Sequence, residues 1–174
     1  MTVLETERLA LRRLSVDDAP FLLELLNDPA FLRFIGDRGV RTLDDARAYV
    51  ERGPAASYAQ HGFGLYRVAL RDDDTPVGIC GLLKRDALEH ADLGYAFLAA
   101  HRGHGYALES AAAVVAHARR ELGLGRLLAI TSPDNDASIR VLEKLGFRLE
   151  RLTKLSEDAH EVKLFALDEP SNGP

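Results

Sequence analysis

Several residue types and patterns are missing or scarce in this chain of 174 residues, and each absence excludes a class of protein. Cys80 is the only cysteine, which excludes an intramolecular disulfide and a cysteine-rich metal site. No apolar run approaches the roughly 20 residues that a membrane-spanning helix requires. The first residues, 1–13, carry charges in place of the apolar segment of a signal peptide. We therefore expect a cytoplasmic protein that binds no metal and contacts no membrane.

The chain also lacks an excess of positive charge. Its formal net charge of −5 at pH 7 argues against sequence-independent binding to nucleic acid, which requires a basic face. The same charge is compatible with a cationic substrate. The length suits one domain with a sizeable core. We expect a single domain over residues 1–168 and a disordered tail over 169–174, where Pro, Ser, Asn and Gly gather.

Among the features that are present, the segment Arg-Gly-His-Gly-Tyr-Ala at 102–107 is the most informative. It joins a strand-like run to a helix-like run, and two glycines at such a joint let the backbone approach a ligand closely. The free N–H groups at the start of the helix then favour a phosphate. A dinucleotide fingerprint would need glycine where Leu108 stands, and a Walker loop would need Lys followed by Ser or Thr. A plain tight turn is the alternative interpretation.

Hydrophobic periodicity and capping residues predict the remaining elements. Ser15 and Thr42 each precede an acidic residue by three positions, which is typical of a capping box at a helix start. The sequence Asn-Asp-Pro at 27–29 is expected to end the first of these helices. The predicted order is strand 8–14, helices 15–26 and 42–53, strands 63–70, 76–84 and 91–98, helix 106–122, strand 126–131, helix 136–145, and strands 147–154 and 161–167.

The loop at 102–107 and this order of elements resemble the GCN5-related N-acetyltransferases, the GNAT superfamily, over nearly the whole chain. The segments 4–9, 93–98, 105–109 and 135–147 are similar to its RimJ/RimL-like branch, which acetylates α-amino groups of ribosomal proteins and small amines. The resemblance implies a mixed α/β fold: a mostly antiparallel sheet with one splayed parallel strand pair, flanked by about four helices. It also implies an acyltransferase that uses acetyl-CoA, and it is compatible with a homodimer.

Carried over residue by residue, the resemblance assigns the coenzyme to the backbone of two neighbouring segments. The amides of the loop would face the pyrophosphate, and pantetheine would lie beside the preceding strand like an extra strand. A backbone N–H at Phe97 or Leu98 would polarise the thioester carbonyl. The coenzyme-binding residues implied are Phe97, Leu98, Ala99, Arg102, Gly103, His104, Gly105, Tyr106, Ala107, Asn135 and Arg140. The alternatives are core packing for Phe97 and Leu98, and solvated side chains for Arg102, His104 and Arg140.

Asn135 and Ser138 match the family's Asn-x-x-Ser motif, in which Asn reaches pantetheine and Ser donates a hydrogen bond to the departing sulfur. The same pair also resembles an N-cap and first-turn pair of a helix. The tyrosine acid that is common in the family is absent from 140–145, which makes Ser138 the candidate acid.

Asp92 is the candidate base that accepts the proton of the attacking amine, because relatives often carry Glu at this place of the strand. The alternative is a carboxylate that orients a water molecule or pairs with an arginine. His90 is the second candidate, since alternation along a strand would place it on the same face as Asp92. Glu109 would lie in the first turn of the long helix, where a carboxylate suits the helix dipole or could face the acceptor.

Cys80 lies in an apolar alternation and is interpreted as a core thiol, so the amine is expected to attack directly in a ternary complex. The acceptor is a primary amine, either a protein N-terminus or a small molecule. It would be selected by the segments 31–42 and 156–160, where Arg33, Arg38 and Arg41 could meet an acidic group or be solvated. One rival hypothesis is a non-catalytic acyl-CoA-binding module of the same fold. A second is a Rossmann-type nucleotide-binding domain, against which the three consecutive strands predicted at 63–98 argue.

Overall fold

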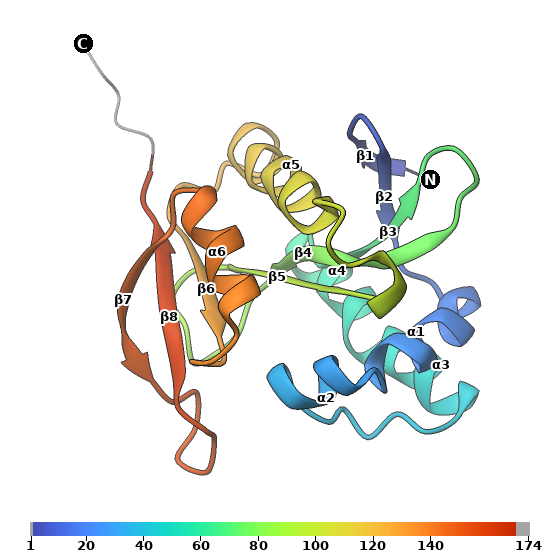
Figure 1. Ribbon diagram of the computed structural model, residues 1–174, viewed down its shortest axis with the longest axis horizontal. Helices are drawn as coiled ribbons and strands as arrows, with labels where there is room; N and C mark the ends of the chain where they lie inside the picture. The colour runs from blue at the N-terminus through green and yellow to red at the C-terminus, as the bar shows by residue number, and fades with distance from the viewer. Residues whose placement is uncertain (1, 170–174) are drawn as a thin grey trace.

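The computed structural model describes residues 2–169, which form one eight-stranded sheet with helices on both faces (Figure 1). The strand order is β1-β2-β3-β4-β5-β6-β8-β7, and β5 and β6 are the one parallel pair among these strands. The strands are β1 (Thr2–Glu5), β2 (Leu9–Arg13), β3 (Leu65–Leu70), β4 (Pro76–Leu83), β5 (Asp92–Phe97), β6 (Leu127–Thr131), β7 (Arg148–Thr153) and β8 (Val162–Leu167). The predicted mixed sheet with one parallel pair is confirmed.

Two hydrophobic cores cover the two faces of the sheet. On one face, α1 (Ala19–Leu26), α2 (Pro29–Phe34) and α3 (Leu43–Arg52) pack through buried side chains such as Leu22 and Val50 against Leu65 and Ile79. On the other face lie α5 (Tyr106–Arg120) and α6 (Asp136–Lys144), with Val114 and Leu142 in a core that also contains Val68 and Phe165. Each face of the sheet is therefore covered by helices that pack on it through a hydrophobic core.

The helices are more numerous than predicted, because two prolines that were interpreted as helix ends begin new helices. Pro29 is the first residue of α2, and Pro54 is the first residue of α4 (Pro54–His61). Proline suits this position, since the first N–H groups of a helix have no intrahelical partner. Residues 2–169 thus contain six α-helices in place of about four. The four-residue strand β1 was also missed, because it is too short to display a clear alternation.

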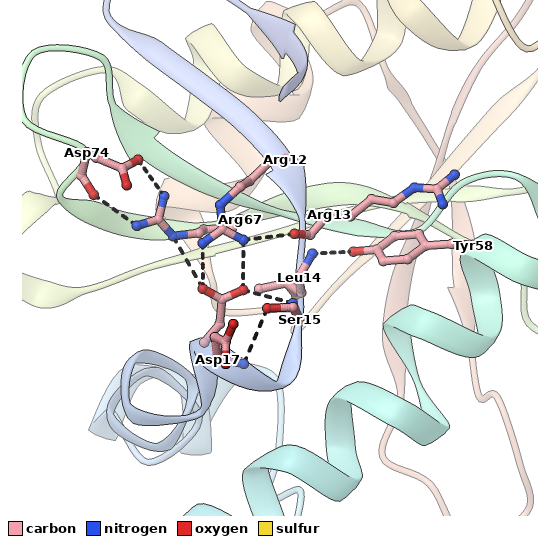
Figure 2. A network of polar contacts seen from close by, with 9 residues as sticks. Arg12, Arg13, Leu14, Ser15, Asp17, Tyr58, Arg67 and Asp74 are labelled. Atoms are coloured by element: carbon pink, nitrogen blue, oxygen red, sulfur yellow. Dashed lines mark hydrogen bonds and ion pairs between the residues drawn. The ribbon is translucent and has the colours of Figure 1, made fainter. Parts of the chain in front are cut away.

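A network of ion pairs fixes the start of the first helical layer on the sheet (Figure 2). The buried Asp18 ends the short 3-10 helix η1 (Val16–Asp18) and accepts hydrogen bonds from Arg12 on β2, at 2.9 and 2.7 Å. It also accepts the backbone N–H of Ser15 at 2.9 Å. Arg67 on β3 lies 3.6 Å from the same carboxylate and donates to Asp74 at 2.8 Å. These contacts tie η1, and α1 directly after it, to β2 and β3.

The strands β5 and β6 stay together over only two pairs of residues, Asp92 with Leu128 and Leu93 with Ala129. Beyond these pairs β5 continues to Phe97 and β6 to Thr131, and the two strands separate (Figure 1). The splay predicted for the parallel pair is therefore present.

Residues 170–174, most of the predicted disordered tail, lie outside the described residues. Within 2–169, no helix combines the length and apolar character needed to cross a bilayer.

Candidate functional site

A cleft of about 1550 Å³ opens where β5 and β6 separate. Its walls come from α2, α3, α4, β5, the start of α5, β6, α6 and the segment that leads into β8. Pockets for ordinary small ligands measure about 300–1,000 Å³. This cleft therefore has room for a large coenzyme together with a second substrate.

Most of the predicted site residues meet in this cleft. Those that line it are Asp92, Phe97, Arg102, Gly103, Gly105, Tyr106, Ala107, Asn135, Ser138 and Arg140. Leu98 and Ala99 line a separate depression of about 750 Å³. His104 is not part of the cleft lining, and its ring stacks on Tyr106 with centroids 5.5 Å apart. The fold thus brings residues 102–107 and 135–140, which are far apart in the sequence, to the same cleft.

The glycine loop, defined as residues 102–107, requires its two glycines. Gly103 has φ +81° and Gly105 has φ +82°, a left-handed conformation that strains other residues. Gly105 is the N-cap of α5, so the first N–H groups of that helix begin directly at the loop. Residues 102–105 are exposed, and both glycines line the cleft, which gives an anion access to these donors.

Arg102, a predicted phosphate ligand, is already engaged by protein groups. Its Nε donates to the carbonyl oxygen of Phe97 at 3.0 Å, and its Nη2 donates to the carboxylate of Asp28. Asp28 is the N-cap of α2 and accepts the N–H of Ala30 at 3.0 Å. Arg102 therefore joins the glycine loop to the start of α2.

The end of β5 presents backbone groups to the splayed edge. The N–H of Leu98 donates to the carbonyl oxygen of Val77 on the β4 side, at 2.9 Å. Successive residues of a strand direct their N–H groups to opposite sides, so the N–H of Phe97 is directed to the side of β6. Of the two amides predicted to polarise a thioester, Phe97 has the suitable direction. Ala99 begins a 3-10 turn, η2 (Ala99–His101), so extended backbone ends before it.

Asp92 is a buried carboxylate at the start of the splay, with 1% of its surface exposed. Arg85 Nε donates to both of its oxygens, at 3.1 and 3.2 Å. Burial raises the pKa of Asp92 to about 6, although the charge of Arg85 opposes the shift. The predicted pairing with an arginine is present, and the raised pKa suits a proton acceptor near neutral pH. His90 lies in the bend before β5, so the expectation that it shares a strand face with Asp92 is wrong.

Asn135 and Ser138 sit at the start of α6, where Asn135 is the N-cap and its Oδ1 accepts the N–H of Ser138 at 3.3 Å. The Oγ of Ser138 lies 2.9 Å from the hydroxyl oxygen of Tyr95 on β5. Tyr95 also donates to the backbone carbonyl of Ser138 at 3.0 Å. Burial raises the pKa of Tyr95 to about 12.

Tyr95 was not among the predicted site residues, because the tyrosine acid of the family was expected only on the helix that is α6. Alternation was the available signal: Tyr95 lies between Leu93 and Phe97 at two-residue spacing, and both of these pack in the core beneath α5 and α6. A tyrosine on that face of β5 is directed at the helical layer that contains Ser138.

Two further candidates lie away from the cleft. Glu109 accepts hydrogen bonds from Thr6 and from Arg8, the latter at 2.8 Å, so it fixes the turn between β1 and β2 on α5. Cys80 is fully buried, and burial raises its pKa to about 12. A thiol with this pKa is not a nucleophile at neutral pH.

The arginines proposed to meet the acceptor differ in their surroundings. Arg33 pairs with Asp134 at 3.3 Å, and Arg41 pairs with Asp37. Arg38 lines the cleft, and no ion pair is found for it within residues 2–169. Within the same residues, no group of three side chains has the arrangement of a metal site.

Comparison with known proteins agrees with this architecture. The family model described as an acetyltransferase (GNAT) domain matches residues 8–148. The uncharacterized N-acetyltransferase YnaD of Bacillus subtilis is 30% identical over 149 residues, which cover 86% of this chain and 84% of YnaD. The crystal structure of an acetyltransferase from Agrobacterium tumefaciens superposes with a TM-score of 0.81 at 26% identity, covering 95% and 94% of the two chains. RimL, a ribosomal-protein α-N-acetyltransferase solved in complex with coenzyme A, shares the fold with a TM-score of 0.81 at 22% identity and coverage of 97% and 98%.

Proposed function

This chain belongs to the GNAT family of acetyltransferases, and we propose from that premise that it moves an acetyl group from acetyl-CoA to a primary amine. The acceptor is a protein N-terminal amine or a small-molecule amine, and it attacks the thioester directly in a ternary complex. We propose that residues 1–168 form the single catalytic domain.

The observation that carries the proposal is the splay of β5 and β6 with the glycine loop at its end. The residues present fit the coenzyme: α5 begins at an exposed loop of two left-handed glycines, which suits a diphosphate. The backbone of β5 faces an edge that β6 has left, which suits an extended pantetheine arm. When bound, acetyl-CoA supplies the activated acetyl group.

Residues of the cleft suit the three chemical steps of acetyl transfer: removal of a proton from the amine, stabilisation of the thioester oxygen and stabilisation of the departing sulfur. An α-amino group has a pKa near 8 and a lysine side chain one near 10.4, so an acceptor amine is mostly protonated at pH 7. Asp92 is the proposed acceptor of that proton, directly or through water, because its raised pKa lies close to working pH. The N–H of Phe97 is the proposed donor to the thioester oxygen. Ser138 is the proposed donor to the departing sulfur, with Asn135 holding its backbone in place.

Charge along the cleft supports an acceptor that carries an acidic group near its amine. Of the five acidic residues that line the cleft, Asp28, Asp37, Asp92 and Asp134 are each paired with an arginine, and Glu161 has no ion pair within residues 2–169. Arg38 and Arg52 add positive charge to the lining. A carboxylate on the acceptor would gain from these groups, whereas a polyamine would not.

A thiol-release screen tests the proposal. Purified protein and acetyl-CoA are offered peptides with varied N-termini, amino acids, polyamines and aminoglycosides, each acidic amine being matched with its amide. We expect free coenzyme A to be released with at least one acceptor, and faster with the carboxylate than with its amide. Coenzyme binding without thiol release from any amine would favour a non-catalytic acyl-CoA-binding module. A protein that binds no coenzyme would contradict both.

A further inference from the structure

Two hydroxyl groups meet across the splay, one from the sheet and one from the helix that covers it. Tyr95 reaches from β5 to the first turn of α6, where its oxygen lies 2.9 Å from Ser138 Oγ and 3.0 Å from the Ser138 carbonyl oxygen. Both residues line the cleft. Both residues therefore belong to the wall of the cleft while their hydroxyl groups are bonded to each other.

We propose that Tyr95 is a positioning residue that makes Ser138 a hydrogen-bond donor to the sulfur of coenzyme A. This inference rests on the proposed function, because it concerns the thiolate that leaves in acetyl transfer. Tyr95 acts through Ser138 and does not itself touch the sulfur.

Tyr95 and Ser138 together have two hydroxyl hydrogens, and the direction of each decides whether Ser138 can donate to a ligand. Each hydroxyl carries one hydrogen, and hydroxyl hydrogens rotate to suit their partners. If Tyr95 donates to the Ser138 carbonyl, Ser138 donates to Tyr95, and no hydrogen is directed into the cleft. If Tyr95 turns its hydrogen to Ser138 Oγ, the serine hydrogen is released for a third atom. A negatively charged sulfur in the cleft favours the second arrangement, because hydrogen bonds to ions are the stronger ones.

The pKa values of the Tyr95 phenol and of a thiol show that the phenol keeps its proton. Burial holds the pKa of Tyr95 near 12, whereas an ordinary thiol has a pKa of about 8.5. The phenol is therefore the weaker acid, and transfer of its proton to a thiolate would be unfavourable. The pair stabilises the thiolate by hydrogen bonding alone, with no bond broken in either residue.

Titration calorimetry with coenzyme A and with desulfo-coenzyme A, in which hydrogen replaces the thiol, tests the inference. The titrations are run at about pH 10, where an alkyl thiol such as that of coenzyme A is substantially ionised. We expect wild-type protein to prefer coenzyme A, Ser138→Ala to lose the preference, and Tyr95→Phe to reduce it roughly tenfold. Affinity for the desulfo compound should be the same in all three. The double variant should match Ser138→Ala, because Tyr95 acts through the serine.

Tyr66→Phe is the matched control, since this buried tyrosine on β3 does not line the cleft. Melting temperatures establish that each variant is folded. An undiminished preference in Tyr95→Phe, or an equal loss of affinity for both compounds, would overturn the inference and leave the proposed function intact. Failure of the wild type to bind either compound would overturn both.

Discussion

Arg102 binds the carboxylate of Asp28, a residue 74 positions earlier in the chain. The same carboxylate caps α2, so one side chain fixes both the glycine loop and the start of a helix on the other wall of the cleft. The guanidinium of Arg102 also donates to the last residue of β5. The glycine loop and the start of α2 are thus joined by a single ion pair.

We expect Arg102→Gln and Asp28→Asn each to lower the free energy of unfolding by about 0.5–1 kcal/mol, with a double variant that is less destabilised than their sum. Asn keeps the helix cap while removing the charge, which isolates the ion pair. Denaturant unfolding measures this double-mutant cycle. If Arg102 instead serves a phosphate, Arg102→Gln will weaken coenzyme binding while Asp28→Asn will not, and the cycle will show no coupling.

The glycine loop allows a second prediction with a close control. Gly105→Ala places a side chain on a backbone with φ +82°, and Gly123→Ala does the same at φ +65° in the turn after α5. Both should cost about 1–2 kcal/mol of stability, because left-handed backbone is strained for alanine. Of these two glycines, Gly105 lines the cleft and Gly123 does not. We expect a loss of coenzyme affinity of roughly tenfold in Gly105→Ala, as for one charge-assisted hydrogen bond, and none in Gly123→Ala. Equal affinities by calorimetry would count against the loop as the phosphate site.

Asp92 gives a pH prediction. Its pKa is raised to about 6, so kcat/KM should rise with pH through a step near 6, in addition to the step of the acceptor amine. Asp92→Asn should lack the step near 6. His90→Gln is the necessary control, since histidines ordinarily titrate near 6.5. Disappearance of the step in His90→Gln, with its survival in Asp92→Asn, would reverse the assignment.

The raised pKa of Asp92 also makes the free energy of unfolding depend on pH. The folded protein binds the Asp92 proton more tightly than the unfolded chain, whose aspartate titrates near 3.9. Stability from this residue is therefore lost as pH rises from about 4 to above 6. We expect the unfolding free energy of Asp92→Asn, relative to wild type, to increase over this range. A constant difference would contradict the raised pKa.

Substitution of Cys80 distinguishes direct attack by the amine from a mechanism with a covalent acetyl-cysteine intermediate. The thiol is fully buried with a pKa of about 12, so Cys80→Ala should keep kcat close to that of wild type. Removing a buried side-chain atom should cost about 1 kcal/mol of stability. Steady-state kinetics and thermal melting measure the two effects. Loss of acetyl transfer in a variant that still folds would refute direct attack.

Local signals predicted much of this molecule. The capping boxes at Ser15 and Thr42 are both present in full. The two glycines of the loop lie at the predicted joint between β5 and α5, and both take a positive φ there. Such features depend on a few adjacent residues, which is why they can be recognised in one sequence. The errors at Pro29 and Pro54 are local as well, because proline both ends one helix and begins the next.

The sequence by itself determined the order of all strands and α-helices except β1, α2 and α4, together with the glycine loop at the start of α5 and the cap of α6. Only the tertiary structure decided that Tyr95 meets Ser138, that Arg102 meets Asp28, and that Asp92 is buried beside Arg85. The first two pairs join residues 43 and 74 positions apart. Such contacts depend on which strands are neighbours in the sheet and where β5 and β6 part, and no short stretch of sequence encodes that geometry.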